Sequence, residues 1–136
     1  MIKVFLGGTC NESTWRDILV NLLEIDYFNP VVDDWTKECM EEEIKQRNSC
    51  DYVLYVLTPL MTGTYAIAEA VDDSNKRPEK TLFCYLEKDM NEKGKFPVFS
   101  KGQLRSLGQV RSMIKQNGAK TFETLAQIAD YLNKVS

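Results

Sequence analysis

Short apolar runs alternate with segments of helical hydrophobic periodicity along the whole chain, and this alternation limits the possible folds more than any other feature. A run of about six apolar residues predicts a buried strand, whereas apolar side chains at i, i+3, i+4 and i+7 predict an amphipathic helix. Strands that alternate strictly with helices form parallel sheets covered by helices on both faces. The sequence therefore predicts an α/β fold.

The predicted strands are rich in Val, Leu and Phe, which is typical of strands buried on both faces. They span residues 2–6, 27–32, 51–58, 80–86 and 120–122. The predicted helices span residues 12–24 (with Asn11 as N-cap), 36–49 (with Met40 and Ile44 inward), 64–74 and 101–116, followed by a last helix with Leu125, Ile128 and Leu132 inward. A polar segment, residues 87–99, is the expected flexible loop.

Five predicted strands without a linker or an internal repeat indicate a single domain over residues 1–136. We expect three layers, with helices on both faces of a doubly wound, five-stranded parallel sheet. The expected strand order is the flavodoxin-like order 2-1-3-4-5. In such sheets, ligands bind beyond the carboxyl ends of the strands, where the strand order reverses.

Charge and cysteine content limit the partners and the compartment. The formal net charge is −3, which argues against a surface that neutralises nucleic-acid phosphates. The four cysteines lack the spacing of a zinc site, and the N-terminal residues do not resemble a signal peptide, so we expect free thiols and a cytoplasmic location. The longest apolar run, residues 52–57, is shorter than the ~20 residues of a membrane span, so no membrane association is expected.

The chain contains no histidine, and this excludes several classes of catalysis. Ser–His and Cys–His nucleophile pairs, imidazole general bases and His-ligated zinc are all impossible. Acid–base or nucleophilic chemistry must therefore be performed by carboxylates, Cys, Lys, Tyr or a cofactor.

Two of the loops expected at the carboxyl edge of the sheet carry candidate binding residues. The first contains Gly7, Gly8 and Thr9 and leads to Trp15; its glycines permit either close approach of a ligand or simply a tight turn. It matches neither GxGxxG nor a phosphate-binding P-loop. The second loop contains Asn29, Asp33, Asp34 and Trp35, whose aromatic ring can stack on a base while the acids bind hydroxyls. The alternative for the second loop is helix capping by Asp34 and a packed Trp35.

The third loop leads through Thr64 and Tyr65 to Glu69, about one and a half turns into a predicted helix. Small alanine neighbours leave room for a ligand or for close packing on the sheet, and the helix start favours an ionised carboxylate. Glu43 lies in a run of three glutamates, at the edge of the predicted buried stripe. Each carboxylate is either a solvated surface group or a group that points over the end of the sheet.

The order and spacing of these motifs resemble those of nucleoside 2-deoxyribosyltransferase-like proteins. The resemblance covers residues 2–86 and rests on KVFLGGT at residues 3–9, Trp15, the segment 29–35, DYVLYV at residues 51–56 and GTYAIAEA at residues 63–70. Members of this family have a five-stranded, doubly wound α/β fold and move 2-deoxyribose between nucleobases. The resemblance implies a nucleoside or nucleotide and a free nucleobase as small-molecule partners, no cofactor, no metal, and homo-oligomerisation.

The resemblance also implies roles for the two glutamates. Glu69 matches the carboxylate that attacks the anomeric carbon and forms a covalent glycosyl intermediate. Glu43, eight residues before Asp51, matches the acid that orients the nucleoside, with Glu in place of the usual Asp. The acid usual in the loop before the nucleophile is absent, and Thr62 and Gly63 occupy that region. Protonation of the leaving base would then fall to another group, for which the acids of the second loop are candidates.

Two alternatives remain open. The first is hydrolysis of an N-riboside (a nucleoside, a nucleotide or NAD), since NAD glycohydrolases of the TIR type also combine a flavodoxin-like sheet with a single Glu. The second is a nucleotide-binding domain without turnover. The missing loop acid favours both over transfer to a base.

Overall fold

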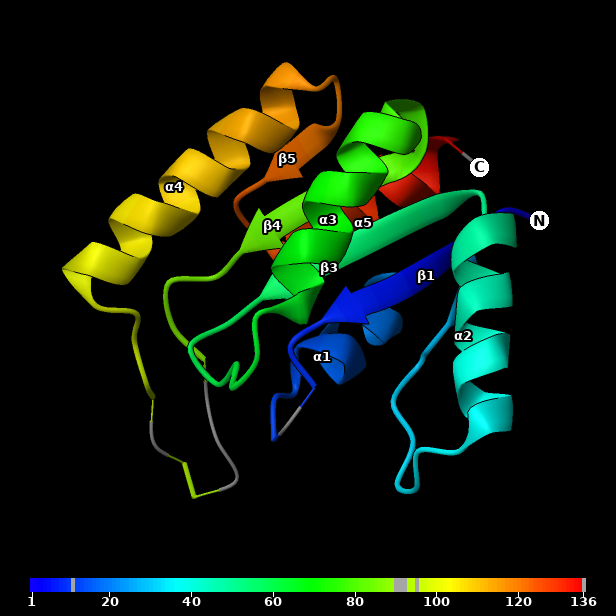
Figure 1. Cartoon of the computed structure of the whole chain (residues 1–136), viewed down its shortest axis with the longest axis horizontal. Coiled ribbons are helices and arrows are strands. Elements are labelled where there is room, and N and C mark those ends of the chain that lie inside the picture. The colour runs from blue at the N-terminus through cyan, green and yellow to red at the C-terminus, as the bar shows by residue number, and fades with distance from the viewer. Residues whose placement is uncertain (11, 90–92, 95, 136) are drawn as a thin grey trace.

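All five strands run parallel in one sheet with the order β2-β1-β3-β4-β5 (Figure 1). The computed structural model describes residues 1–10, 12–89, 93–94 and 96–135. The strands are β1 (Lys3–Gly8), β2 (Asp26–Phe28), β3 (Tyr52–Leu57), β4 (Thr81–Tyr85) and β5 (Lys120–Phe122). The helices are α1 (Trp15–Leu22), α2 (Lys37–Ser49), α3 (Tyr65–Lys76), α4 (Lys101–Gln116) and α5 (Leu125–Val135), with a short 3-10 helix η1 (Pro78–Lys80). The predicted flavodoxin-like architecture and strand order are confirmed.

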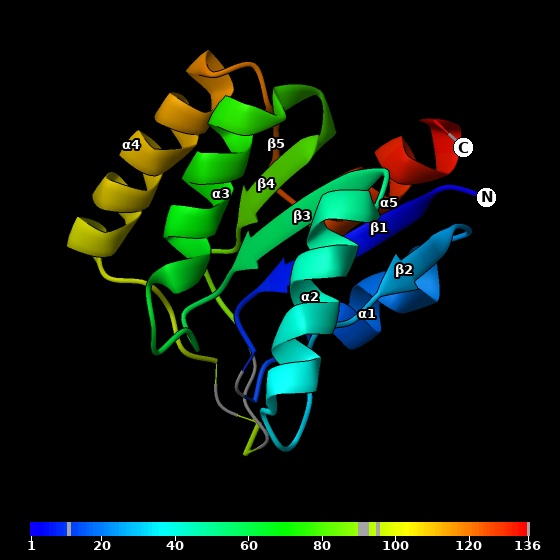
Figure 2. The same ribbon diagram turned by 45° about the vertical axis from the view of Figure 1, so that its right-hand side comes forward.

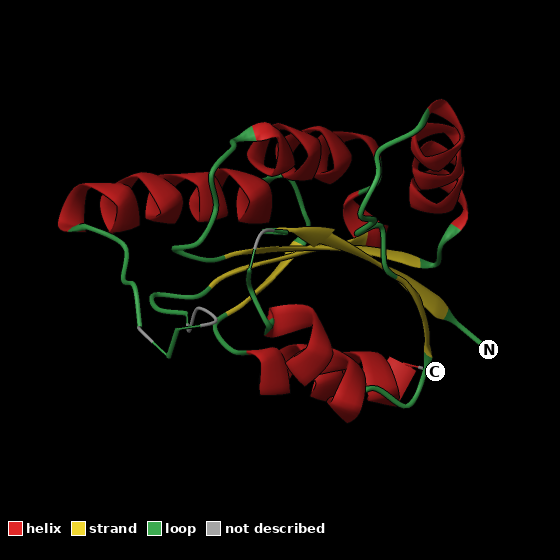
Figure 3. Cartoon of the chain, turned by 90° about the horizontal axis from the view of Figure 1, so that it is seen from below, coloured by secondary structure: helices red, strands yellow, loops and turns green. Residues whose placement is uncertain are grey.

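The sheet is covered on both faces (Figure 3). On one face, α1 and α5 pack on alternate side chains of β1, β3 and β4, with Trp15, Leu19, Ile128 and Leu132 almost fully buried. On the other face, α3 and α4 pack on the remaining side chains of these strands. Such burial on both faces explains the continuous apolar runs of the central strands.

Helix α2 differs from the prediction. It lies on the same face as α3 and α4, but none of its residues is buried. The prediction that Met40 and Ile44 point inward is wrong, since their exposed fractions are 43% and 54%. The helix is placed over the edge of the sheet beyond β1, where β2 is too short to offer it a broad apolar surface.

Other boundaries also differ from the sequence prediction. Helix α1 begins at Trp15 rather than at residue 12, and its predicted N-cap, Asn11, lies outside the described residues. Strand β2 ends at Phe28, because the chain turns at Asn29, whose side chain accepts a hydrogen bond from the Val31 amide. The predicted loop 87–99 includes an antiparallel bridge between Lys88 and Val98, and part of it lies outside the described residues. No helix in the described part of the chain is long and apolar enough to cross a membrane.

The end of β1 explains why two glycines follow each other. Gly8 has a φ of 114°, and a Cβ atom there would lie 2.0 Å from the carbonyl oxygen of Val56 in the neighbouring strand. A Cβ on Gly7 would lie 2.8 Å from the Tyr55 ring. Close contact with β3 therefore requires glycine at this point, and the first loop leaves the sheet beside the loop after β3 (Figure 2).

Candidate active site

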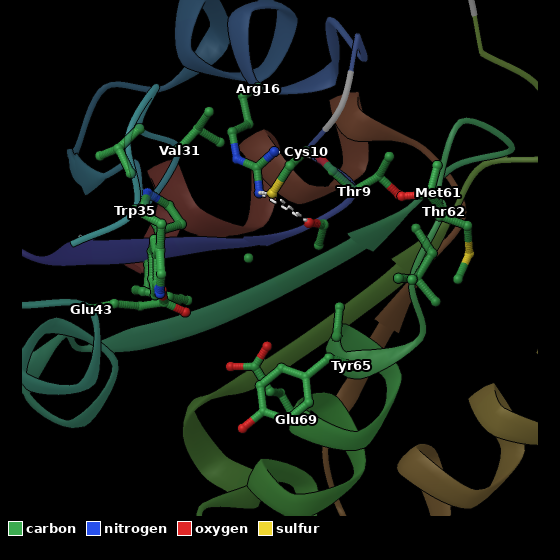
Figure 4. A pocket seen from close by; sticks show the side chains of 18 of the residues that line it. Thr9, Cys10, Arg16, Val31, Trp35, Glu43, Met61, Thr62, Tyr65 and Glu69 are labelled. Atoms are coloured by element: carbon green, nitrogen blue, oxygen red, sulfur yellow. Dashed lines mark hydrogen bonds between the residues drawn. The ribbon is translucent and has the colours of Figure 1, made fainter. Parts of the chain in front are cut away.

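A cavity of about 600 Å³ opens at the carboxyl ends of β1 and β3, where the strand order reverses. Its volume lies within the range of small-molecule binding sites. Three segments contribute most of its wall: the end of β1 with the loop that follows it, the chain from Pro30 to Glu43, which runs from the loop after β2 into α2, and the chain from Leu57 to Glu69 (Figure 4). This is the position at which doubly wound sheets bind ligands.

The structure brings most of the predicted site residues into the wall of this cavity. They are Gly7, Gly8, Thr9, Asp33, Trp35, Glu43, Tyr65 and Glu69. Residues 10, 12, 16, 30–32, 61–63 and 66 also line it, together with Phe5 and Leu57. All three predicted loops thus meet in one place, as the sheet topology requires.

Four predicted binding residues lie elsewhere. Trp15 is buried in the core, and its indole N–H donates a hydrogen bond of 2.8 Å to the carbonyl of Thr9, so it supports the first loop from behind. The Asn29 side chain serves the turn after β2. Asp34 does not cap α2 with its side chain, since Thr36 is the N-cap. Thr64 precedes α3 without a capping bond from its side chain.

Glu69 and Glu43 enter the cavity from two different helices (Figure 4). Burial raises the pKa of Glu69 to about 7; the charges of Glu43 and Asp73 act in the same direction, and Arg47 opposes them. Burial also raises the pKa of Glu43, against the charges of Arg47 and Arg16. The start of a helix was expected to keep Glu69 ionised, but burial outweighs that effect. The result is a pair of partly desolvated carboxylates that influence each other.

A network of charged side chains lies behind Glu69. Arg47 in α2 donates two hydrogen bonds to Asp73 in α3, at 3.0 and 3.1 Å, and its third nitrogen lies 3.6 Å from Glu69. Arg77 and the hydroxyl of Tyr55 also donate to Asp73, whose side chain is fully buried. Burial alone would raise the pKa of Asp73, but the hydrogen bonds from Arg47, Tyr55 and Arg77 hold that pKa below its usual value.

Arg16 is a buried cation that holds the first loop in shape. Its guanidinium group donates to the carbonyl oxygens of Leu6, Thr9 and Gly8, and one nitrogen lies 3.9 Å from the sulfur of Cys10. Satisfied by backbone carbonyls in this way, the arginine fixes the path of the chain along the cavity. Sequence analysis missed it, because an arginine in the first turn of an amphipathic helix is usually exposed.

The wall also carries exposed apolar and aromatic side chains. Val31, Val32 and Trp35 precede α2, and Tyr65 follows β3. Met61, which also lines the cavity, is partly buried. Trp35 and Tyr65 have exposed fractions of 56% and 73%. Aromatic faces beside a polar centre suit a planar heterocycle attached to a sugar, because the ring can stack while the sugar hydroxyls reach the carboxylates.

The side chains of the site do not form a metal centre among the described residues. Within the described ranges, no three His, Cys, Asp or Glu side chains are grouped closely enough to hold a metal ion. Glu43 and Glu69 are two carboxylates, and the side chains nearest to Glu69 include the cation Arg47. The positive charge of Arg47 would repel a metal cation bound to Glu69, so this pair of carboxylates suits an uncharged ligand with hydroxyl groups better than a metal ion.

Comparison with protein-family models gives a match to the part of the chain that forms this site. The family model described as "Nucleoside 2-deoxyribosyltransferase like" matches residues 1–87. The matched segment contains β1 to β4 and all of the residues that line the cavity. No curated protein matched the chain in a separate search. Since the family model covers more than half of its length, the chain belongs to the nucleoside 2-deoxyribosyltransferase-like family.

Proposed function

We propose that the protein transfers 2-deoxyribose between nucleobases by breaking and forming N-glycosidic bonds of (deoxy)nucleosides. The observation that carries this proposal is the meeting of Glu69 and Glu43 in one cavity, from separate helices, beside the exposed rings of Trp35 and Tyr65. A nucleoside complements these groups, because its planar base can stack on the aromatic rings and the hydroxyls of its sugar can hydrogen-bond to the carboxylates. Family membership supports the same class of reaction.

In the first step, the carboxylate of Glu69 attacks the anomeric carbon of the sugar. The bond from that carbon to the base nitrogen breaks, its electron pair stays on the base, and an ester forms between the sugar and Glu69. Positive charge develops at the anomeric carbon in the transition state, where a nearby carboxylate stabilises it. A nitrogen of a second base then attacks the opposite face and displaces Glu69, so two inversions retain the configuration. The proton of that nitrogen passes to the group that protonated the leaving base, which restores it.

Glu43 is proposed to hold the sugar by accepting hydrogen bonds from its hydroxyls. Its half-buried position beside Glu69 suits that role. The leaving base needs a proton, and Asp33, unlike Asp34, lines the cavity. We therefore propose Asp33 as the proton donor in place of the missing loop acid.

The sequence of the third loop favours hydrolysis as a second candidate function. Thr62 and Gly63 line the cavity where the family usually has an acid, so activation of an incoming base lacks that group. Water can then attack the glycosyl ester and release free sugar. Hydrolysis of a nucleotide or of NAD would begin with the same attack by Glu69. Homo-oligomerisation, the cytoplasmic location and the single domain stay predictions.

The deciding experiment is incubation with a 2′-deoxynucleoside and a different free base, followed by chromatography of the products. We expect a new nucleoside that carries the added base. Free sugar without a new nucleoside would identify a hydrolase. Binding of the nucleoside without either product, at all pH values from 5 to 9, would contradict enzymatic function and leave a binding domain.

A further inference from the structure

We propose that Arg47 is a positioning residue for Glu69. Fixed to the buried Asp73 by two of its nitrogens, it presents its third nitrogen to the Glu69 carboxylate and so sets the direction in which that carboxylate faces the cavity. Nothing in the family resemblance assigns a role to this arginine. Its catalytic consequence rests on the proposed function, whereas its hold on Glu69 does not.

The geometry is that of a fixed fork. Nε and Nη2 of Arg47 contact the two oxygens of Asp73, and Nη1 lies 3.6 Å from Oε2 of Glu69. Arg47 is 17% exposed, Glu69 12%, and Asp73 0%. A planar guanidinium group bound to one carboxylate in this bidentate way has little freedom to rotate, so its third nitrogen is fixed in space.

Asp73 is itself held from two other sides. Arg77 donates from the end of α3 at 2.9 Å, and Tyr55 donates from β3. The anchor of Arg47 is therefore tied both to the sheet and to α3, the helix that carries Glu69. Arg47 lies outside the wall of the cavity, and its influence on a ligand must pass through Glu69.

Several other charges act on Glu69 together with Arg47. Glu43 in α2 and Asp73 in α3 raise its pKa, and Arg47 lowers it. Arg47 is also 3.5 Å from Asp72, a half-exposed residue of α3 that pairs with Lys76 as well. Without Arg47, the remaining charges that act on Glu69 are negative, and the protonated acid would be favoured.

The helical spacing agrees with this role. Glu43 and Arg47 are four residues apart in α2 and share one face of the helix. One turn of α2 thus places the carboxylate of Glu43 in the cavity wall and the guanidinium cation of Arg47 beside Glu69. Lys at position 47 would keep the charge but would offer one nitrogen where Arg47 uses three.

Arg77 provides a matched control. Like Arg47, it donates to Asp73 from a partly buried position, but no ion pair joins it to Glu69 among the described residues. It also donates a hydrogen bond of 3.3 Å to the backbone carbonyl of Arg47, a contact that does not involve the guanidinium group of Arg47. Arg47→Gln and Arg77→Gln each remove one cationic partner of Asp73, and only the first removes the neighbour of Glu69. A difference between the two variants therefore reports the contact with Glu69 rather than the loss of support for Asp73.

The test is a carbon-13 NMR titration of the Glu69 carboxyl in protein labelled at the glutamate side-chain carboxyl, with the signal assigned by its loss in Glu69→Gln. An opposite charge within ~4–6 Å lowers a carboxyl pKa by about 1–3, so Arg47→Gln is expected to raise the pKa of Glu69 by at least about 1. Arg77→Gln is expected to leave it within a few tenths. An unchanged pKa in Arg47→Gln, or an equal rise in both variants, would overturn the proposal.

Turnover supplies an independent measurement. It uses Arg47→Lys, which keeps the positive charge and so still tests the proposal if Arg47→Gln does not fold. Arg47→Lys is expected to reduce kcat at least tenfold at pH 9, where Glu69 is ionised, with KM changed less than threefold. A wild-type kcat in Arg47→Lys would overturn the positioning role. Since the titration needs no substrate, a protein that passes it but exchanges no base would refute the proposed function and not the hold of Arg47 on Glu69.

Discussion

At the scale of single residues, Glu69 is the proposed nucleophile. The sequence predicted its place early in a helix, between small neighbours, but not its pKa near 7. That value depends on burial and on charges contributed by α2, which meets α3 only in the folded protein. Arg47 was missed for the same reason, although its spacing of four residues from Glu43 is a signal visible in the sequence.

The pKa of Glu69 predicts the pH dependence of turnover. The attacking group is the carboxylate, so activity should rise as pH increases through about 7, the pKa of this side chain in the free protein. A profile of kcat/KM against pH from 5 to 9 measures it. An acidic limb near 4.5, the ordinary pKa of Glu, would mean that a different carboxylate attacks or that Glu69 is solvated.

Variants of Glu43 and of its neighbour Glu42 distinguish a specific role in the cavity from a general effect of negative charge on α2. Glu43 lines the cavity, whereas Glu42 is exposed and binds Gln46 on the surface of α2. Glu43→Ala should lower kcat/KM by about 10–100-fold because the sugar is no longer held in position. Glu42→Ala should change it less than twofold. Equal kcat/KM values for both variants would make Glu43 a surface acid.

At the scale of elements, the pattern of strands and helices was predictable, and the edges of the molecule were not. Buried central strands have a continuous apolar signal, so β1, β3 and β4 were found within one or two residues. Strand β2 and helix α2 lie at the border of the sheet, where Met40, Ile44 and Val31 are exposed. In the sequence, exposed apolar residues at helical spacing look the same as a buried stripe, so Met40 and Ile44 were wrongly predicted to point inward.

The junction of β1 with the first loop makes a prediction about stability. Gly8→Ala would place a Cβ atom against the Val56 carbonyl at a positive φ, so it should lower the free energy of unfolding by more than about 2 kcal/mol. Gly63→Ala is the control, since nothing lies within 4 Å of a Cβ there. Urea unfolding curves measure both. Similar midpoints for Gly8→Ala and the wild type would show that the strand end relaxes freely.

At the scale of the whole molecule, burial of Glu69 lowers the stability of the fold at neutral and alkaline pH. The pKa of Glu69 is about 7 in the folded protein and near 4.5 in an unfolded chain. Between these values the folded state binds more protons, so the contribution of Glu69 to stability falls as pH rises. The burial that raises the pKa of the proposed nucleophile therefore weakens the fold above pH 5.

Glu69→Gln should reveal this cost. The variant lacks the ionisation, so its free energy of unfolding should exceed that of the wild type by up to about 3 kcal/mol at pH 8, and the difference should shrink towards pH 5. Unfolding in urea at both pH values measures it. A constant difference across this range would show that the pKa of Glu69 is not raised by folding.

The proposed function depends on a covalent bond between Glu69 and the sugar. The most direct measurement is mass spectrometry of peptides after incubation with a 2′-deoxy-2′-fluoroarabinosyl nucleoside, whose fluorine disfavours positive charge at the anomeric carbon and so slows loss of the ester. We predict one 2-deoxy-2-fluoroarabinosyl group on the peptide that contains Glu69, and none in Glu69→Gln. Release of the base with no adduct on Glu69, or an adduct on another residue, would contradict the account.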